Sequence, residues 1–414
     1  MSSGPLTEMK AKIFFLRNDP PQNTQPLFFK TIGPLSVRRS DYISHRATRV
    51  WLVEPIASRQ NVESTGETCL LVLKDTWSDI DAQTEKEIQD ALFNDIKCFS
   101  KRLANAVDSG DWSLLEPDER DAFGSLMDKE KEPAKNLLRD EGYRKHFVTI
   151  LQDWKGRTLK PPGSQAESIR AVPLFYQSRP RQYPGKTQHR VLCKEICEPL
   201  DDVKTFGEVI VGMEGAVSAM LILFLAGWVH RDISASNVMM YQGQGVLGDL
   251  EVAKRFRVRH QHSDEDFLKG TPYFMATEIY KGFTQARYPR PTIRTWDFTL
   301  NPKPDKRIPF QHNFLHDLES IWWILLWTML QRVPFAPSHQ YAAGLFVNTR
   351  NIPQAREEAF VAGGALISSL FTSLHPCFLI RDFDCTVDLL RCEMGDTCDF
   401  FDISRGSSNV WSIL

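Results

Sequence analysis

The chain lacks an apolar run long enough to cross a bilayer, which takes about 20 residues. Its longest apolar runs are Ala216–Trp228 and Ile321–Leu330. Residues 1–10 also lack the apolar segment of a secretory signal. We therefore expect an intracellular protein that has no membrane partner, with cytoplasm and nucleus both left open.

An excess of one charge is missing as well. The chain has 50 Lys and Arg against 52 Asp and Glu, a net charge of -2, which does not favour a nucleic-acid partner. Its eight cysteines lack metal-ligand spacing. Cys193 and Cys197 are four residues apart, and Cys385, Cys392 and Cys398 have no histidines paired with them. This pattern favours reduced thiols over a structural zinc site.

The chain does have enough hydrophobic residues to form a large core. It contains 414 residues, 42% hydrophobic and 11% aromatic, enough for two domains or one large bilobal domain. Short runs typical of strands occur at Arg49–Val53, Cys69–Leu73, His146–Leu151 and His189–Ile196. Between the second and third, Asp79–Phe99 carries apolar residues at helical spacing.

The later part of the chain has mostly helical signals. Thr205-x-x-Glu208 is a capping-box pattern that opens a long apolar helix. Val238–Tyr241 and Val246–Leu247 flank a glycine-containing turn and predict a hairpin. Leu315–Leu330 is apolar nearly all round and predicts a buried helix.

These patterns predict an α+β protein with three regions. Residues 1–25 form a loose lead-in. Residues 26–199 form a small β-rich lobe, with a charged helical insertion near residues 100–145. Residues 200–414 form a mainly helical lobe. The oligomeric state stays open.

The segment from His230 to Asn237 has the composition of a phosphoryl-transfer site. It reads His-Arg-Asp-Ile-Ser-Ala-Ser-Asn, and Asp249 follows the predicted hairpin. Phosphoryl transfer needs a carboxylate that accepts the proton of the nucleophile, together with oxygen ligands for divalent cations. Asp232 suits the first role, and Asn237 and Asp249 suit the second. This order matches the catalytic-loop signature of protein kinases.

Four further features occur in the order expected of a kinase. Lys74 ends an apolar strand, where a kinase places its phosphate-binding lysine. Glu85 lies on the following predicted helix, on the same face as Ile88. Its neighbour Glu87 does not share this register and is the weaker candidate for pairing with the lysine.

The other two features follow the hairpin. Gly270–Glu278 resembles the end of a kinase activation segment. Asp317 starts the buried helix, where its carboxylate can accept backbone N–H groups of the catalytic loop.

Taken together, these residues resemble the fungal-type protein kinases, over residues 26–335. The similar stretches are Arg46–Trp51, Val72–Trp77, His230–Ser234, Gly270–Glu278 and His316–Ser320. The resemblance implies a bilobal kinase-like fold, ATP and Mg²⁺ as cofactors, and protein Ser or Thr hydroxyls as acceptors. It also implies that Lys74 contacts the phosphates and that Glu85 orients Lys74.

The resemblance implies four more roles in the later lobe. Asp232 would be the base, and Thr271 would hydrogen-bond near it. Asn237 and Asp249 would bind the metal.

The chain departs from ordinary kinases at several positions. The usual glycine-rich loop is absent, and residues 32–49 contain one glycine, Gly33. Ser234 stands where Ser/Thr kinases usually carry lysine, and Glu251 replaces the glycine of Asp-Phe-Gly. Two alternatives to an active protein kinase therefore stay open. One is a pseudokinase acting as a nucleotide-binding or scaffold module, and the other is a small-molecule phosphotransferase.

Overall fold

The structure is a computed structural model. It describes residues 13–16, 27–37, 48–57, 70–159, 185–256, 270–281, 312–332, 336–347, 353 and 355–356. The C-terminal cysteines Cys385, Cys392 and Cys398 lie outside the described residues.

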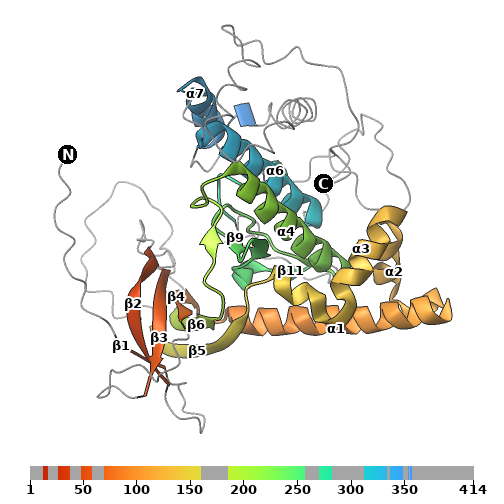
Figure 1. Cartoon of the computed structure of the whole chain (residues 1–414), viewed down its shortest axis with the longest axis horizontal. Coiled ribbons are helices and arrows are strands. Elements are labelled where there is room, and N and C mark those ends of the chain that lie inside the picture. The colour runs from red at the N-terminus through yellow and green to blue at the C-terminus, as the bar shows by residue number, and fades with distance from the viewer. Residues whose placement is uncertain are drawn as a thin grey trace, which may run out of the picture. The chain divides into compact units, whose positions relative to one another are not determined.

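The chain divides into two compact units (Figure 1). The first comprises Met1–Gln89 and Val148–Ile196, and the second comprises Asp90–Phe147 and Cys197–Leu414. The sequence-based division placed residues 90–147 and 197–199 with the first lobe, whereas the structure groups them with the second unit. We describe each unit by itself.

The first unit contains a six-stranded antiparallel sheet in the order β1-β2-β3-β4-β6-β5. The strands are β1 (Ile13–Leu16), β2 (Leu27–Val37), β3 (Arg49–Ile56), β4 (Leu71–Asp79), β5 (Ile150–Leu159) and β6 (Lys186–Cys193). Trp51, Val53, Leu73 and Leu192 belong to one buried cluster on this sheet. The β-rich character expected of this part is therefore present.

Several boundaries differ from those expected, and Lys74 lies inside strand β4 rather than at its end. The lead-in contains β1, because its Ile-Phe-Phe-Leu run pairs with Leu27–Lys30 of β2. Strand β4 runs on to Asp79, paired with β6, so the next helix begins at Glu85 rather than Asp79. Strand β5 begins at Ile150, because a 3₁₀ helix occupies the residues up to His146.

Helix α1 (Glu85–Ser109) starts at a capping box. Thr84 Oγ1 accepts from the Glu87 N–H at 3.1 Å, and Glu87 Oε2 accepts from the Thr84 N–H at 2.8 Å. The boundary between the units falls inside this helix, after Gln89. Its buried apolar residues recur at helical spacing and include Ile88, Leu92, Ile96, Phe99 and Leu103.

The charged insertion is helical, as expected. It consists of η1 (Trp112–Leu114), α2 (Pro117–Gly124), α3 (Asp128–Leu138) and η2 (Arg139–His146). It groups with the second unit because α2, α3 and η2 pack against helix α4 of that unit and bury apolar residues such as Leu115, Phe123 and Leu138.

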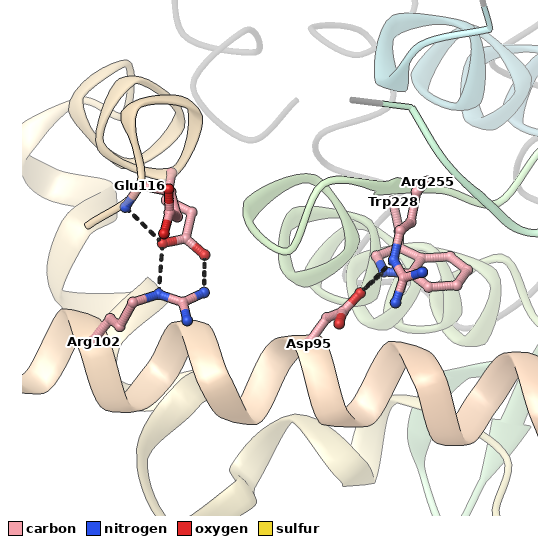
Figure 2. A network of polar contacts seen from close by, with 6 residues as sticks. Asp95, Arg102, Glu116, Trp228 and Arg255 are labelled. Atoms are coloured by element: carbon pink, nitrogen blue, oxygen red, sulfur yellow. Dashed lines mark hydrogen bonds and ion pairs between the residues drawn. The ribbon is translucent and has the colours of Figure 1, made fainter. Parts of the chain in front are cut away.

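The ion pair of Arg102 with Glu119 helps to fix the insertion to α1. Arg102 donates from Nε to Glu119 Oε2 at 2.9 Å and from Nη2 to Oε1. The same Glu119 oxygen Oε2 accepts from the Glu116 N–H at 3.1 Å (Figure 2).

The second unit is mainly helical. Its remaining helices are α4 (Phe206–Leu225), α5 (Thr277–Lys281), α6 (Phe314–Gln331), α7 (Ala336–Leu345) and the 3₁₀ turn η4 (Leu250–Val252). Its short strands are β7 (Glu198–Pro199), β8 (Trp228–Val229), β9 (Val238–Tyr241), β10 (Gln244–Leu247) and β11 (Lys254–Arg255). Helices α4 and α6 lie side by side (Figure 1). The α+β class predicted from the sequence is confirmed.

The hairpin β9–β10 turns tightly and packs closely against α4. Its turn residues Gln242 and Gly243 have φ angles of 49° and 78°, the left-handed conformation that matches strand twist in a two-residue hairpin. A Cβ on Gly215 of α4 would lie 2.2 Å from the Gly245 carbonyl oxygen. Glycine is therefore needed where the helix and the hairpin meet.

Helix α4 is also the described helix that is long and apolar enough to span a membrane by length and composition. Half of its most apolar stretch is buried inside the protein, where the helix packs against β8, β9, β10 and α6.

Candidate active site

In the first unit, Lys74 and Glu85 form an ion pair. The Lys74 Nζ atom donates to Glu85 Oε2 at 2.9 Å. Lys74 comes from strand β4 and Glu85 from the first residue of α1. Glu87 points to a different partner, since it caps Thr84. The preference for Glu85 over Glu87, drawn from helix register, is confirmed.

This ion pair is nearly buried. The side chains of Lys74 and Glu85 are 12% and 9% exposed. Removing one partner of a buried pair leaves an uncompensated charge and destabilises a protein by about 3–5 kcal/mol. The ion pair therefore holds both side chains in one geometry, and strand β4 fixes the backbone of Lys74.

In the second unit, the catalytic loop is held from the start of α6. The carboxylate of Asp317 accepts the His230 N–H at 2.7 Å and the Arg231 N–H at 2.9 Å. The sequence-based expectation for Asp317 is confirmed. Burial raises the pKa of the Asp317 carboxyl, while His230 and the two N–H groups act in the opposite direction.

Residue Asp232 has its carboxylate fixed by Thr271. The backbone N–H and the hydroxyl of Thr271 both donate to Asp232 Oδ1, each at 2.8 Å. Burial raises the pKa of the Asp232 carboxyl, and the charge of Asp249 raises it further. The carboxylates of Asp232 and Asp249 thus lie within electrostatic reach of each other.

The hairpin brings Asn237 and Asp249 to this region. The Asn237 side-chain Nδ2 donates to the Asp232 carbonyl at 2.8 Å, which leaves the amide oxygen as the atom suited to a cation. The Gly248 N–H donates to the Asn237 carbonyl at 2.9 Å and closes the base of the hairpin next to Asp249. The backbone of Asp249 itself has the left-handed conformation, with φ 57° and ψ 60°.

Asn237 and Asp249 fit a divalent cation whose remaining ligands are water molecules and substrate phosphates. A carboxylate and an amide oxygen are hard ligands of the kind that Mg²⁺ prefers, and Mg²⁺ usually keeps waters and binds substrate phosphates. The unfavourable interaction between the charges of Asp232 and Asp249 would be reduced by a cation. Within the described ranges, no group of three or more His, Cys, Asp or Glu forms an all-protein metal site.

Residue Ser234 occupies the position at which Ser/Thr kinases usually carry a lysine. It is fully buried, and its hydroxyl is 3.0 Å from the hydroxyl of Ser236. The position therefore supports the loop internally.

Two supporting residues were missed by the sequence analysis. Glu319 Oε1 accepts the N–H and the hydroxyl of Thr277, at 2.8 and 2.7 Å, and the Trp323 indole N–H at 3.0 Å. Arg356 donates to the carbonyls of Pro272 at 3.0 Å and Met275 at 2.6 Å. Both fix the segment that follows Thr271, and no local pattern signals either contact because the partners are 42 to 84 residues away.

Two comparisons with known proteins bear on which family the chain belongs to. No curated protein matches the chain. A family model described as fungal protein kinase matches residues 30–329, well over half of the chain and a range that includes Lys74, Asp232 and Asp249. The chain therefore belongs to the fungal protein kinase family.

Proposed function

We propose that this kinase transfers the γ-phosphoryl group of ATP to Ser or Thr hydroxyls of protein substrates, with Asp232 as the base. The observation that carries the proposal is the pair of hydrogen bonds from Thr271 to Asp232 Oδ1, each at 2.8 Å. They orient the carboxylate and leave its second oxygen available to the proton of an acceptor hydroxyl. Membership of a kinase family supports ATP and a divalent metal in general.

For the metal we propose Mg²⁺, with Asn237 and Asp249 as its protein ligands. Bound there, it would neutralise charge on the phosphates, which is the main requirement of phosphoryl transfer. Asn237 is prepared for this role because its Nδ2 is already used by the Asp232 carbonyl. Asp249 is prepared because the hairpin fixes the residue before it.

For the phosphate contact we propose Lys74, oriented by Glu85. The 2.9 Å ion pair fixes the ammonium at the end of its flexible stem. A fixed ammonium is worth more to a reacting phosphate than a mobile one, because little reorganisation is needed when the charge develops.

The test is Mg²⁺-dependent phosphorylation of casein by the full chain, followed by phosphoamino-acid analysis. Asp232→Asn should lower the turnover number by about 10²–10⁴-fold, the usual contribution of a positioned base. Asp108→Asn is the control, because Asp108 is an exposed residue of α1. Phosphotyrosine as the product would refute the Ser/Thr assignment. Equal rates for wild type and Asp232→Asn would refute the role of the base.

A second candidate is a pseudokinase that binds nucleotide without turnover. Serine at position 234 favours it, since the cation that usually stands there to stabilise the transferring phosphoryl group is absent from that position. This candidate predicts that Mg²⁺–ATP raises the melting temperature of the wild type while phosphate transfer stays at background.

A further inference from the structure

Three residues from distant parts of the chain meet on helix α1, near the catalytic loop. Asp95 Oδ2 accepts the indole N–H of Trp228 at 2.9 Å and the Nε–H of Arg255 at 2.7 Å. The Arg255 guanidinium lies 5.0 Å from the centre of the Trp228 ring (Figure 2). We call these three residues the Asp95 cluster.

The cluster supports a strand pair that is too short to be stable alone. Strands β8 and β11 join at two residue pairs, Lys254 with Val229 and Arg255 with Trp228. One more backbone bond follows, from the Phe256 N–H to the Gly227 carbonyl at 3.1 Å. An isolated two-stranded ladder is marginal even at greater length, so side chains must add to it.

The two strands of this pair are close in sequence to the two carboxylate residues of the site, Asp232 and Asp249. Val229 of β8 is followed directly by His230 and Arg231, and then by Asp232. On the other strand, Arg255 comes six residues after Asp249. The register between β8 and β11 therefore restrains the two chain segments on which Asp232 and Asp249 stand.

We propose that Asp95 is a positioning residue for phosphoryl transfer, which holds β11 against β8 by binding Trp228 and Arg255 at one carboxylate oxygen. The proposal rests on the proposed function, since it assigns Asp232 and Asp249 their roles. Asp95 touches neither of them and acts through the strand pair.

The chemistry of the three groups favours this role over that of an ordinary surface ion pair. The indole N–H can only donate, and Trp228 is 5% exposed, so it needs an acceptor that the protein supplies. Asp95 and Arg255 are 27% and 47% exposed, and exposed pairs add little to global stability. Loss of Asp95 should therefore change local order and turnover more than the melting temperature.

The experiment compares Asp95→Ala with Lys97→Ala in the full chain. Lys97 is two residues further along α1, and its ion pair with Glu141, at 3.4 Å, does not involve β8 or β11. The first readout is hydrogen exchange of the backbone amides of residues 252–256. The second is the turnover number and KM for ATP with casein as the acceptor.

We expect faster exchange at residues 252–256 in Asp95→Ala and not in Lys97→Ala. Because a displacement of about 1 Å can lower a rate by about 10²-fold, the turnover number of Asp95→Ala should fall by about 10- to 100-fold. KM for ATP should stay within about twofold of the wild-type value, because Asp95 makes no contact that contributes equally to binding ATP and the transition state. Asp95→Glu, which keeps a carboxylate, should recover part of the loss.

Each contrary result overturns the proposal. Unchanged exchange in Asp95→Ala does so, as does faster exchange with unchanged turnover, or an equal effect of Lys97→Ala. If Asp95→Ala does not fold, Trp228→Phe takes its place, because it removes the indole N–H and keeps an aromatic ring at this position. If the wild type itself shows no turnover, the proposed function fails and exchange alone decides whether Asp95 holds the strand pair.

Discussion

The contact between helix α4 and the hairpin gives a sharp test of how the fold positions the site. In the structure, an added Cβ on Gly215 would lie 2.2 Å from the Gly245 carbonyl oxygen, and one on Gly245 would lie 2.3 Å from the Gly212 carbonyl oxygen. These neighbours are backbone atoms, which cannot rotate away. Gly215→Ala must therefore push the helix and the hairpin apart by about 1 Å, since protein interiors leave no such space free.

The magnitude follows from two opposed effects. Overpacking a core costs about 1–3 kcal/mol, and a contact with a rigid carbonyl belongs at the upper end. Alanine in a helix interior recovers about 1 kcal/mol relative to glycine. The net loss expected for Gly215→Ala is thus about 2 kcal/mol. Gly207, on the first turn of the same helix, has nothing within 4 Å of its added Cβ, so Gly207→Ala should stabilise the protein by about 0.5–1 kcal/mol.

Urea unfolding of both variants measures this difference, and turnover measures its consequence. The hairpin lies between Asn237 and Asp249, so a displacement of about 1 Å should lower turnover by about 10²-fold in Gly215→Ala. Gly207→Ala should keep the rate of the wild type. If Gly215→Ala is as stable as Gly207→Ala, the close packing is not real and the reasoning fails.

Three further predictions concern stability. Asp317→Ala removes the acceptor of two buried N–H groups. At about 1–3 kcal/mol per group, the free energy of unfolding measured in urea should fall by about 2–6 kcal/mol, and a fall below about 1 kcal/mol would contradict the contact. Burial chiefly, and Lys145 to a lesser degree, lower the pKa of His146 from 6.5 to about 4. The unfolded chain therefore binds a proton that the folded protein does not, and stability should fall by about 3 kcal/mol as the pH drops from 6.5 to 4. His146→Gln should flatten that slope, and equal slopes would exclude His146 as its cause. Thr84→Ala removes the cap of α1 and should cost about 0.5–2 kcal/mol, whereas a melting temperature equal to that of the wild type would show that the cap is dispensable.

Features with a local physical cause could be predicted from the sequence. The helix α4 starts at Phe206, because Thr205 and Glu208 satisfy each other's backbone N–H groups as the capping box requires. The hairpin occurs where glycine permits a left-handed turn. The ion pair of Lys74 with Glu85 follows from helix register, because Glu85 shares a helix face with Ile88, three residues further on, and Glu87 does not.

Contacts between distant segments could not be predicted in this way. Asp95 is 133 residues from Trp228 and 160 from Arg255, and its own neighbourhood is an ordinary helix surface. In the sequence, nothing distinguishes Glu319 from other polar residues of its helix, although it accepts hydrogen bonds from both donors of Thr277. The grouping of the insertion with the second unit was not predicted for the same reason, because charge density along residues 100–145 says nothing about which helix the insertion packs against.

Backbone strain shows why a matching motif alone does not make the site. Arg231 and Asp249 have φ angles of 73° and 57°, in a region that costs a residue with a side chain about 1–2 kcal/mol. Such conformations persist only where surrounding structure imposes them. For Arg231 the imposing group is Asp317, 86 residues along the chain. Arg231, next to the proposed base, and Asp249, a proposed metal ligand, thus depend on the folded second unit, and the His-Arg-Asp segment outside that unit would not keep this geometry.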